Sequence, residues 1–359
     1  MALFLSNAAL APLLEIRPII DQLDQAYRRF AGGDGVTTPR FDLQSSPNTA
    51  GETYQLGLTA GVDEQYAAVR IKSDMTFWQK EGGRVTKGKY CRQPGEYMGL
   101  ILLFSSRNGE LLAIMQDGLL QHLRVGADSA IGARYLAREG ASILGILGSG
   151  GMARAHIDTL CEVLPIERVR IYSPTAVNRE VLADYARSKG LQADAVASPA
   201  DCAAGADILS ACTNAIGPVI DQSLLAPGIH VTSIGGTLDD TASKLIDIGL
   251  RLGNATTPSE LPDLNFTDEC MSYTPTEGKS SSGGTKRFAN LAKEQQILLT
   301  DLLANPARGR TNARQITFSE RGNIHGIQFT AVAAAVYEQA LAQKVGQTVD
   351  PGFLQNIRN

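Results

Sequence analysis

The sequence predicts an α/β protein in which a parallel-sheet domain is inserted between the two parts of an α+β domain. Three observations support this prediction. A helix pattern and several strand patterns fill the first 127 residues, short apolar strands then alternate with helices, and an alanine-rich helix pattern lies near the C-terminus. We therefore expect a first part at 1–127, an inserted domain at 128–312 and a return to the first domain at 313–359.

Length and composition fit this two-domain plan. The chain has 359 residues, 43% of them hydrophobic, which is enough for two sizeable cores. A net charge of −4 argues against nucleic acid or an anionic membrane as a partner, and no apolar run is long enough to span a bilayer. The first residues suit a short strand and a helix better than a signal peptide. Five scattered cysteines without metal-ligand spacing favour reduced thiols in the cytoplasm, and we predict no metal site.

The first part reads as a helix followed by a mostly antiparallel sheet. The helix pattern covers Leu13–Phe30. The strand patterns are Tyr54–Leu58, Tyr66–Ile71, Gly99–Phe104 and Leu111–Gln116. The turn Ser106–Gly109 joins the last two strands, and its Asn-Gly pair between apolar runs is a strong hairpin signal.

From Ala127 onward the pattern changes to alternating helices and strands, which is typical of a parallel sheet covered on both faces. A helix is expected at Asp128–Glu139. The expected strands are Ile143–Leu147, Val169–Tyr172, Asp194–Val196, Ile208–Ala211 and Ile229–Ile234. The polar segment Ser259–Phe288 predicts a mobile loop, and Thr330–Val345 predicts a last helix that packs back on the first domain.

A glycine-rich turn after Ile143–Leu147 predicts that this domain binds a nucleotide. The apolar run Ile143–Leu147 breaks into a G-x-G-x-x-A pattern that opens a helix, as in a Rossmann-type dinucleotide-binding unit. The first glycine permits the turn, the second lets the backbone approach a pyrophosphate, and the helix N–H groups face the phosphate oxygens. A plain strand–helix turn is the alternative. The candidate cofactor-binding residues here are Gly148, Gly150, Gly151, Met152 and Ala153.

The next strand predicts which dinucleotide binds. An acidic residue at its end reads the free ribose of NAD(H), but Tyr172–Thr175 contains neither Asp nor Glu. Ser173 and Thr175 can hydrogen-bond a 2′-phosphate, and Arg179 can pair with it, so NADP(H) is favoured and NAD(H) stays possible. Arg179 as a solvated helix residue is the alternative. Thr213 and Gly235 follow later strands at the edge where such sheets bind ligands, and we add them to the cofactor site.

Three further segments resemble the ornithine cyclodeaminase/μ-crystallin family. They are the R-T-G-A-like segment Gln121–Ala127, the G-x-H-I-N-A-V-G-like segment Gly228–Gly236, and the segment Gly309–Ser319, which resembles G-R-T … I-T-x-F-x-S. The resemblance covers nearly the whole chain. It implies a substrate-binding and dimerisation domain built from both chain ends, a Rossmann domain between them, and a homodimer. The family includes cyclodeaminases, alanine dehydrogenases, ketimine reductases and opine-type dehydrogenases.

The resemblance also implies substrate residues. Arg124 matches the family's carboxylate-binding arginine, and Arg40 resembles a second basic residue near the substrate. Arg70 aligns with a family lysine that contacts substrate and assists proton transfer, and Lys72 shares its strand face because side chains alternate. Arginine does not readily release a proton, so Lys72 is the candidate general acid. A solvated edge-strand face is the alternative for both residues.

Two further positions bear on the reaction. His325 precedes the last predicted helix and is a candidate proton donor or substrate contact, with a structural role as the alternative. Thr237 stands where the resemblance implies an aspartate in ornithine cyclodeaminases, which counts against cyclodeamination.

The sequence therefore predicts a cytoplasmic, homodimeric, NAD(P)H-dependent oxidoreductase acting on a small molecule. It would reduce an α-imino acid, or a keto acid plus an amine, to an α-amino acid, as ketimine reductases and amino-acid dehydrogenases do. A cyclodeaminase that recycles NAD⁺, or an inactive crystallin-like nucleotide-binding protein, are the alternatives.

Overall fold

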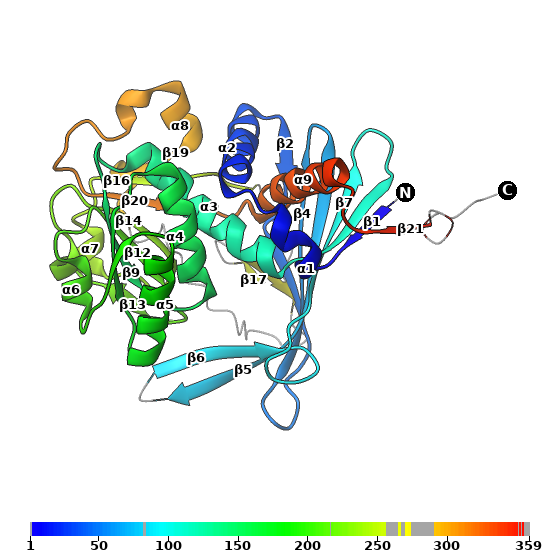
Figure 1. Ribbon diagram of the computed structural model, residues 1–359, viewed down its shortest axis with the longest axis horizontal. Helices are drawn as coiled ribbons and strands as arrows, with labels where there is room; N and C mark the ends of the chain where they lie inside the picture. The colour runs from blue at the N-terminus through cyan, green and yellow to red at the C-terminus, as the bar shows by residue number, and fades with distance from the viewer. Residues whose placement is uncertain are drawn as a thin grey trace.

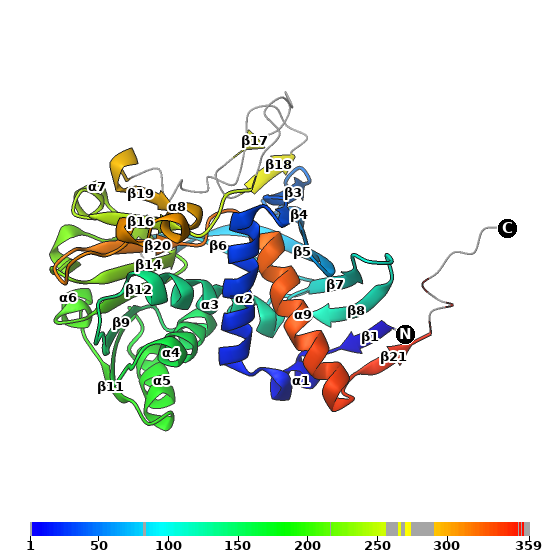
Figure 2. The same cartoon turned by 90° about the horizontal axis from the view of Figure 1, so that it is seen from above.

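The computed structural model describes residues 2–81, 84–215, 217–255, 265–266, 270–273, 291–350, 352 and 354. The chain forms two lobes, each built on one large β-sheet, with three long helices between them (Figures 1 and 2). These helices are α2 (Ile16–Gly32), α3 (Gly118–Leu136) and α9 (His325–Gln343). The predicted fold class is confirmed.

The first lobe is a mixed sheet joined from both chain ends. Its strand order is β17 (Asn265–Phe266), β18 (Cys270–Tyr273), β3 (Arg40–Gln44), β4 (Thr53–Asp63), β5 (Tyr66–Glu81), β7 (Gly99–Ser105), β8 (Leu111–Gln116), β1 (Ala2–Leu5) and β21 (Gln347–Val349). Two strands lie off this path, β2 (Gly35–Thr37) on β4 and β6 (Arg84–Tyr90) on β5. Most neighbours are antiparallel, as predicted, and the expected hairpin joins β7 to β8.

Helix α9 lies across one face of this sheet at very short range. An added Cβ at Gly61 of β4 would lie 2.4 Å from the backbone of Gly326, and one at Gly326 would lie 1.9 Å from the Ala60 carbonyl. Glycine at both positions therefore brings the start of α9 against the middle of the sheet. The Thr330 hydroxyl, one turn later, donates to the Gly61 carbonyl at 3.0 Å.

The second lobe is an eight-stranded, fully parallel sheet. Its order is β11 (Gln192–Ala195), β10 (Arg168–Tyr172), β9 (Ile143–Leu147), β12 (Ile208–Cys212), β14 (His230–Gly235), β20 (Thr317–Glu320), β16 (Ile248–Arg251) and β19 (Gln296–Leu298). The strand order reverses between β9 and β12, which is where doubly wound sheets bind ligands.

Helices cover both faces of the parallel sheet. One face packs on α2, α3, α4 (Gly151–Val163) and α5 (Ala176–Ser188), and the other on α6 (Pro199–Ala203) and α7 (Asp240–Ser243). The remaining elements are α1 (Asn7–Leu10), α8 (Leu299–Ala304), β13 (Pro218–Ile220) and β15 (Thr237–Leu238). Apolar side chains of α2 join the core of the parallel sheet, and Ile19 of the same helix joins the separate core of the first sheet, so α2 packs on both lobes.

Two helices begin earlier than predicted. Helix α3 starts at Gly118 rather than Asp128, and α9 starts at His325 rather than Thr330. Glycine usually ends a helix, but Gly126 lies inside α3, where it packs against another helix. An added Cβ there would lie 2.7 Å from the Ala155 carbonyl of α4, so glycine is needed where the two helices cross.

The prediction also missed several strands. Strands β16, β19 and β20 were not expected, and β20 extends the parallel sheet beyond residue 312, where we drew the domain boundary. The segment predicted as a mobile loop contains β17 and β18, and β18 pairs with β3. Its Ser/Gly-rich run, 280–287, lies outside the described residues. Within the described chain, no helix has the length and apolar character needed to cross a membrane.

Candidate functional site

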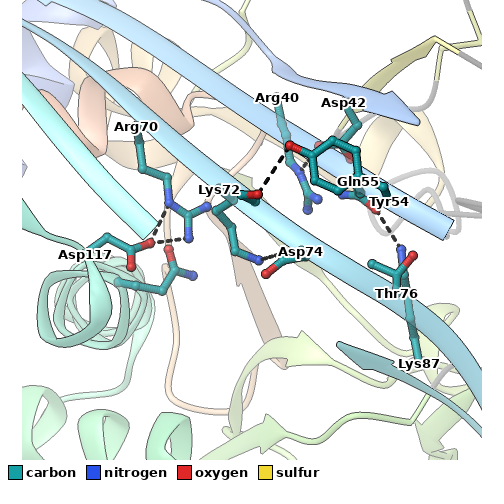
Figure 3. Close-up of polar contacts among 12 residues, drawn as sticks. Arg40, Asp42, Tyr54, Gln55, Arg70, Lys72, Asp74, Thr76, Lys87 and Asp117 are labelled. Atoms are coloured by element: carbon teal, nitrogen blue, oxygen red, sulfur yellow. Dashed lines mark hydrogen bonds and ion pairs between the residues drawn. The ribbon is translucent and has the colours of Figure 1, made fainter. Parts of the chain in front are cut away.

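Two buried cations on β5 line the junction between the lobes, and each has a carboxylate partner (Figure 3). Arg70 donates through Nε to Asp117 at 2.8 Å and through Nη2 at 2.5 Å. Lys72 donates to Asp74 on the same strand face. The predicted alternation therefore holds, and the face is buried rather than a solvated edge. Burial lowers the pKa of Lys72 to about 7, aided by the positive charge of Lys89 and opposed by Asp74.

Arg40 reaches the same region from the neighbouring strand β3. Its Nε donates to Asp42 at 2.8 Å. Gly57 of β4 leaves room for this pair, since an added Cβ would lie 2.8 Å from Asp42 Oδ1. The charge of Arg40 contributes to lowering the pKa of Arg70, after the larger effect of burial, so the two guanidinium groups lie close together.

Arg124 approaches from α3, one of the helices between the lobes. It is 3% exposed, donates to the Gln328 side-chain oxygen, and donates to Gln121 at 3.0 Å. Its guanidinium lies 4.8 Å from the centre of the Phe329 ring, which also carries Arg70 at 5.0 Å. One aromatic ring thus holds two guanidinium groups together. Burial lowers the pKa of Arg124 to about 9, with a further contribution from Arg321.

A small polar cavity lies beside Asp128, one turn of α3 beyond Arg124, on the side of the parallel sheet. It lies between α3 and the carboxyl ends of β14 and β20. Its lining residues are Asp128, Ser129, Thr232, Ser233, Ile234, Ser319, Glu320 and Arg321. Asp128 is 3% exposed and accepts a hydrogen bond from the Tyr27 hydroxyl. Burial raises the pKa of Asp128 to about 6, while Arg124 opposes the rise.

The histidines differ in their surroundings. His325, the first residue of α9, is buried, and its Nδ1 has no hydrogen-bond partner among the described residues. Burial, followed by Arg321 and Arg124, lowers the pKa of His325 well below 6.5, so its imidazole is neutral at pH 7. His230 is held inside the sheet by Thr317 and Ser319, which gives it a structural role.

The glycine turn between β9 and α4 has the geometry that a dinucleotide needs. Gly148 has a φ of +128°, and an added Cβ would lie 2.1 Å from the Cys212 carbonyl, so a side chain is excluded. An added Cβ at Gly150 would meet nothing within 4 Å, which leaves open space beside the first turn of α4. The N–H groups of that turn face this space without intrahelical partners. The turn therefore fits a pyrophosphate.

The side chains predicted to read the ribose gather beside this turn. Ser149 donates to the Ser173 hydroxyl at 2.9 Å, and Ser173 donates to the Thr175 carbonyl at 3.2 Å. Arg179 folds back from α5 and donates to the Ser173 carbonyl at 3.0 Å. The predicted set is thus brought together, with Ser149 as an addition. These residues place hydroxyl groups and one guanidinium group beside the glycine turn.

Thr213 and Gly235 lie together at the reversal point of the sheet. An added Cβ at Gly235 would lie 1.6 Å from the Thr213 carbonyl, so the loops after β12 and β14 are in direct contact. The sequence did not single out the partner residues of the site: Tyr27, Asp42, Asp74, Asp117, Asp128, Gln328 and Phe329. Of these, only Asp74 could have been found from the sequence, because it follows Arg70 and Lys72 at a two-residue spacing and therefore lies on the same face of the strand.

Known proteins resemble this chain in sequence and in fold. A Δ1-pyrroline-2-carboxylate reductase of Bacillus cereus is 28% identical over 256 residues, which is 70% of this chain and 74% of that protein. The solved Δ1-pyrroline-2-carboxylate reductase of Thermococcus litoralis, in complex with NADH and L-proline, is 22% identical with a TM-score of 0.74, covering 97% of this chain and 100% of that one. An archaeal alanine dehydrogenase dimer with bound NAD has a TM-score of 0.74 at 20% identity, covering 97% and 99%.

The family assignment rests on a match along almost the entire sequence. A model of the ornithine cyclodeaminase/mu-crystallin family matches residues 3–344, which include both lobes and the junction between them. This range contains the glycine turn, the β5 cations and Arg124. The chain therefore belongs to the ornithine cyclodeaminase/mu-crystallin family.

Proposed function

We propose that this protein is an NAD(P)H-dependent oxidoreductase that reduces an α-imino acid, or a keto acid plus an amine, to an α-amino acid. The observation that carries the proposal is the meeting of Arg40, Arg70 and Arg124 around His325, since the charges of all three act on its imidazole and two of them lie on the Phe329 ring. Guanidinium groups in a shielded junction are suited to hold a carboxylate. The B. cereus relative is named as a Δ1-pyrroline-2-carboxylate reductase, which supports the same class of chemistry.

The chain's own residues would bind and orient the substrate. Arg40, Arg70 and Arg124 would hold the carboxylate, because a planar guanidinium can form two parallel hydrogen bonds with it. The reduced nicotinamide cofactor, bound along Gly148–Ala153, supplies the hydride. Burial between the lobes would exclude water from the junction and keep the reacting carbon oriented toward the cofactor side.

Lys72 is the proposed proton donor. Its pKa of about 7 places its proton loss near neutral pH, where a general acid is most effective. Arg70 beside it would polarise the imine. His325, neutral at pH 7, would contact the substrate rather than donate a proton. In the reducing direction, Nζ of Lys72 would give one proton to the imine nitrogen while the hydride adds to carbon.

The ribose site favours NADP(H) over NAD(H). The strand end contributes hydroxyls and Arg179 in place of a carboxylate, and both features suit a 2′-phosphate. The cysteines that the structure describes are unpaired, which supports a reducing, cytoplasmic setting.

A homodimer through the open face of the first sheet completes the proposal. The face opposite α9 carries half-buried apolar side chains with no covering layer in the described chain: Leu56, Leu58, Val69, Ile71, Leu100, Leu102 and Ile114. A contiguous apolar face of this kind marks a subunit interface. Val69→Glu should place a charge at its centre and shift the protein to a monomer in sedimentation-velocity runs. An unchanged sedimentation coefficient would contradict this interface.

The function is tested by following absorbance at 340 nm. Purified protein with NADPH and a panel of cyclic imino acids, and of keto acids with ammonia or methylamine, should show net NADPH consumption. A cyclodeaminase would instead release ammonia from ornithine without net consumption. An inactive nucleotide-binding protein would bind NADPH and turn over nothing in either assay.

A further inference from the structure

Helix α3 presents two opposite charges on one face, and each has an atom without a partner. Arg124 and Asp128 are four residues apart, which places their side chains on the same side of the helix. Both are 3% exposed. Arg124 Nε and Asp128 Oδ2 have no hydrogen-bond partner among the described residues. Unpaired buried polar atoms are costly, so this pairing of a free donor and a free acceptor indicates a ligand site.

The surroundings of Asp128 distinguish it from the other carboxylate of the cavity. Glu320 also lines the cavity, but its carboxylate forms an ion pair with Arg251. Asp128 is held at Oδ1 by Tyr27, which leaves Oδ2 for another donor. The charged and titratable groups that face it are Tyr27 from α2, Arg124 from its own helix, and Arg321 beyond β20.

The cations of the junction create a problem for the proposed reaction that Asp128 resolves. A protonated imine or an amino group carries a positive charge, and Arg70, Lys72 and Arg124 would repel it. A buried carboxylate facing the same space offsets this repulsion. The rise along α3 between Arg124 and Asp128 is about 6 Å. An α-amino acid, with its carboxylate at one end and its charged nitrogen beside it, can bridge such a spacing with one hydrogen bond to each side chain.

Building on the proposed function, we propose that Asp128 binds the cationic nitrogen of the substrate while Arg124 binds its carboxylate. The cavity between α3, β14 and β20 then receives the nitrogen end of an α-amino or α-imino acid. Ligands that lack a cationic nitrogen, such as the corresponding simple carboxylic acids, leave Asp128 without a partner. Asp128 therefore gives the site its preference for amino and imino acids over other carboxylic acids.

The test compares matched ligands in the presence of saturating NADP⁺. The pairs are L-proline with cyclopentanecarboxylate and L-alanine with propionate, measured by titration calorimetry at pH 8. The wild type should bind the nitrogen-containing member of at least one pair tenfold or more tightly. In Asp128→Asn this ratio should fall below about threefold while affinity for the simple acid is kept. Asp184→Asn removes the same charge from the exposed surface of α5 and should leave the ratio unchanged.

A pH series on the wild type and on Asp128→Asn gives a second measurement. In the wild type the ratio should fall between pH 8 and pH 5, because Asp128 becomes protonated and loses its charge. Lys72 gains its charge over the same range and also disfavours the cationic nitrogen, so the fall in the wild type must exceed the fall in Asp128→Asn, where only the effect of Lys72 remains. A ratio that persists in Asp128→Asn, a pH-independent ratio, or the absence of any wild-type preference would each overturn the proposal. Turnover of NADPH is measured separately, so a protein that shows the preference but no turnover overturns the proposed function and not this site.

Discussion

The proposed preference for NADP(H) should be reversed by changing Ser173, which follows β10, or Arg179 of α5. Ser173→Asp places a carboxylate where Ser149 and Arg179 now converge, and it can accept the Ser149 hydrogen bond. Arg179→Ala removes the basic group instead. Both changes should weaken NADPH binding, since the first adds repulsion toward the 2′-phosphate and the second removes an attraction. Neither group contacts a charge on NADH, so NADH affinity should change little.

The magnitude follows from the charges and their spacing. A carboxylate at position 173 and a 2′-phosphate about 5 Å away repel by about 1 kcal/mol in a water-like medium and about 3 kcal/mol at an effective dielectric constant of 20. These values correspond to about 5-fold and 150-fold weaker NADPH binding. Arg179→Ala removes a charge-assisted hydrogen bond, which is worth about 1.5–3 kcal/mol and thus a similar factor.

The assay is a fluorescence titration of NADPH and NADH with wild type and variants at low ionic strength. Arg168→Ala is the matched control, because it removes a half-buried arginine from the other end of β10, where Arg168 contacts Gln192. It should leave the ratio of the two dissociation constants unchanged. The reasoning is refuted if the wild type already prefers NADH, or if Ser173→Asp binds NADPH as tightly as the wild type does.

Three further changes have defined outcomes. The pKa of Asp128 is raised in the folded state, so the wild type loses stability as the pH rises through about 6 and this carboxylate becomes charged. Asp128→Asn should therefore be more stable than the wild type by about 1–3 kcal/mol at pH 8. The difference in free energy of unfolding, measured in urea, should vanish toward pH 4. Asp117→Asn leaves the guanidinium of Arg70 buried without its charge partner and should lower the free energy of unfolding by about 3 kcal/mol; a loss below 1 kcal/mol would contradict the burial of this pair. Gly148→Ala forces a Cβ against the Cys212 carbonyl at a φ of +128° and should abolish NADPH binding in the same fluorescence assay, whereas Gly190→Ala, with a φ of +85° but open surroundings, should retain it.

The sequence alone predicted those features of the structure that depend only on residues close together in the chain. The strand Ile143–Leu147 was predicted with the bounds that it has, because a short apolar run ends at a glycine turn that only a few conformations can satisfy. The residues proposed to contact the ribose follow one strand end within a few positions, so their convergence could also be inferred. The alternation of side chains on β5 likewise put Arg70 and Lys72 on one face.

Only the tertiary structure decided which charges meet in the site. Arg70 pairs with Asp117 across 47 positions, and Arg124 reaches Gln328 across 204. No local pattern encodes such distances, because each depends on how the two sheets and the helices between them pack. The same packing buries Asp128 against Tyr27 and leaves one of its oxygens facing a cavity. Local turn chemistry thus determined where a dinucleotide can bind, and burial of distant charges between the lobes determined what can bind beside it.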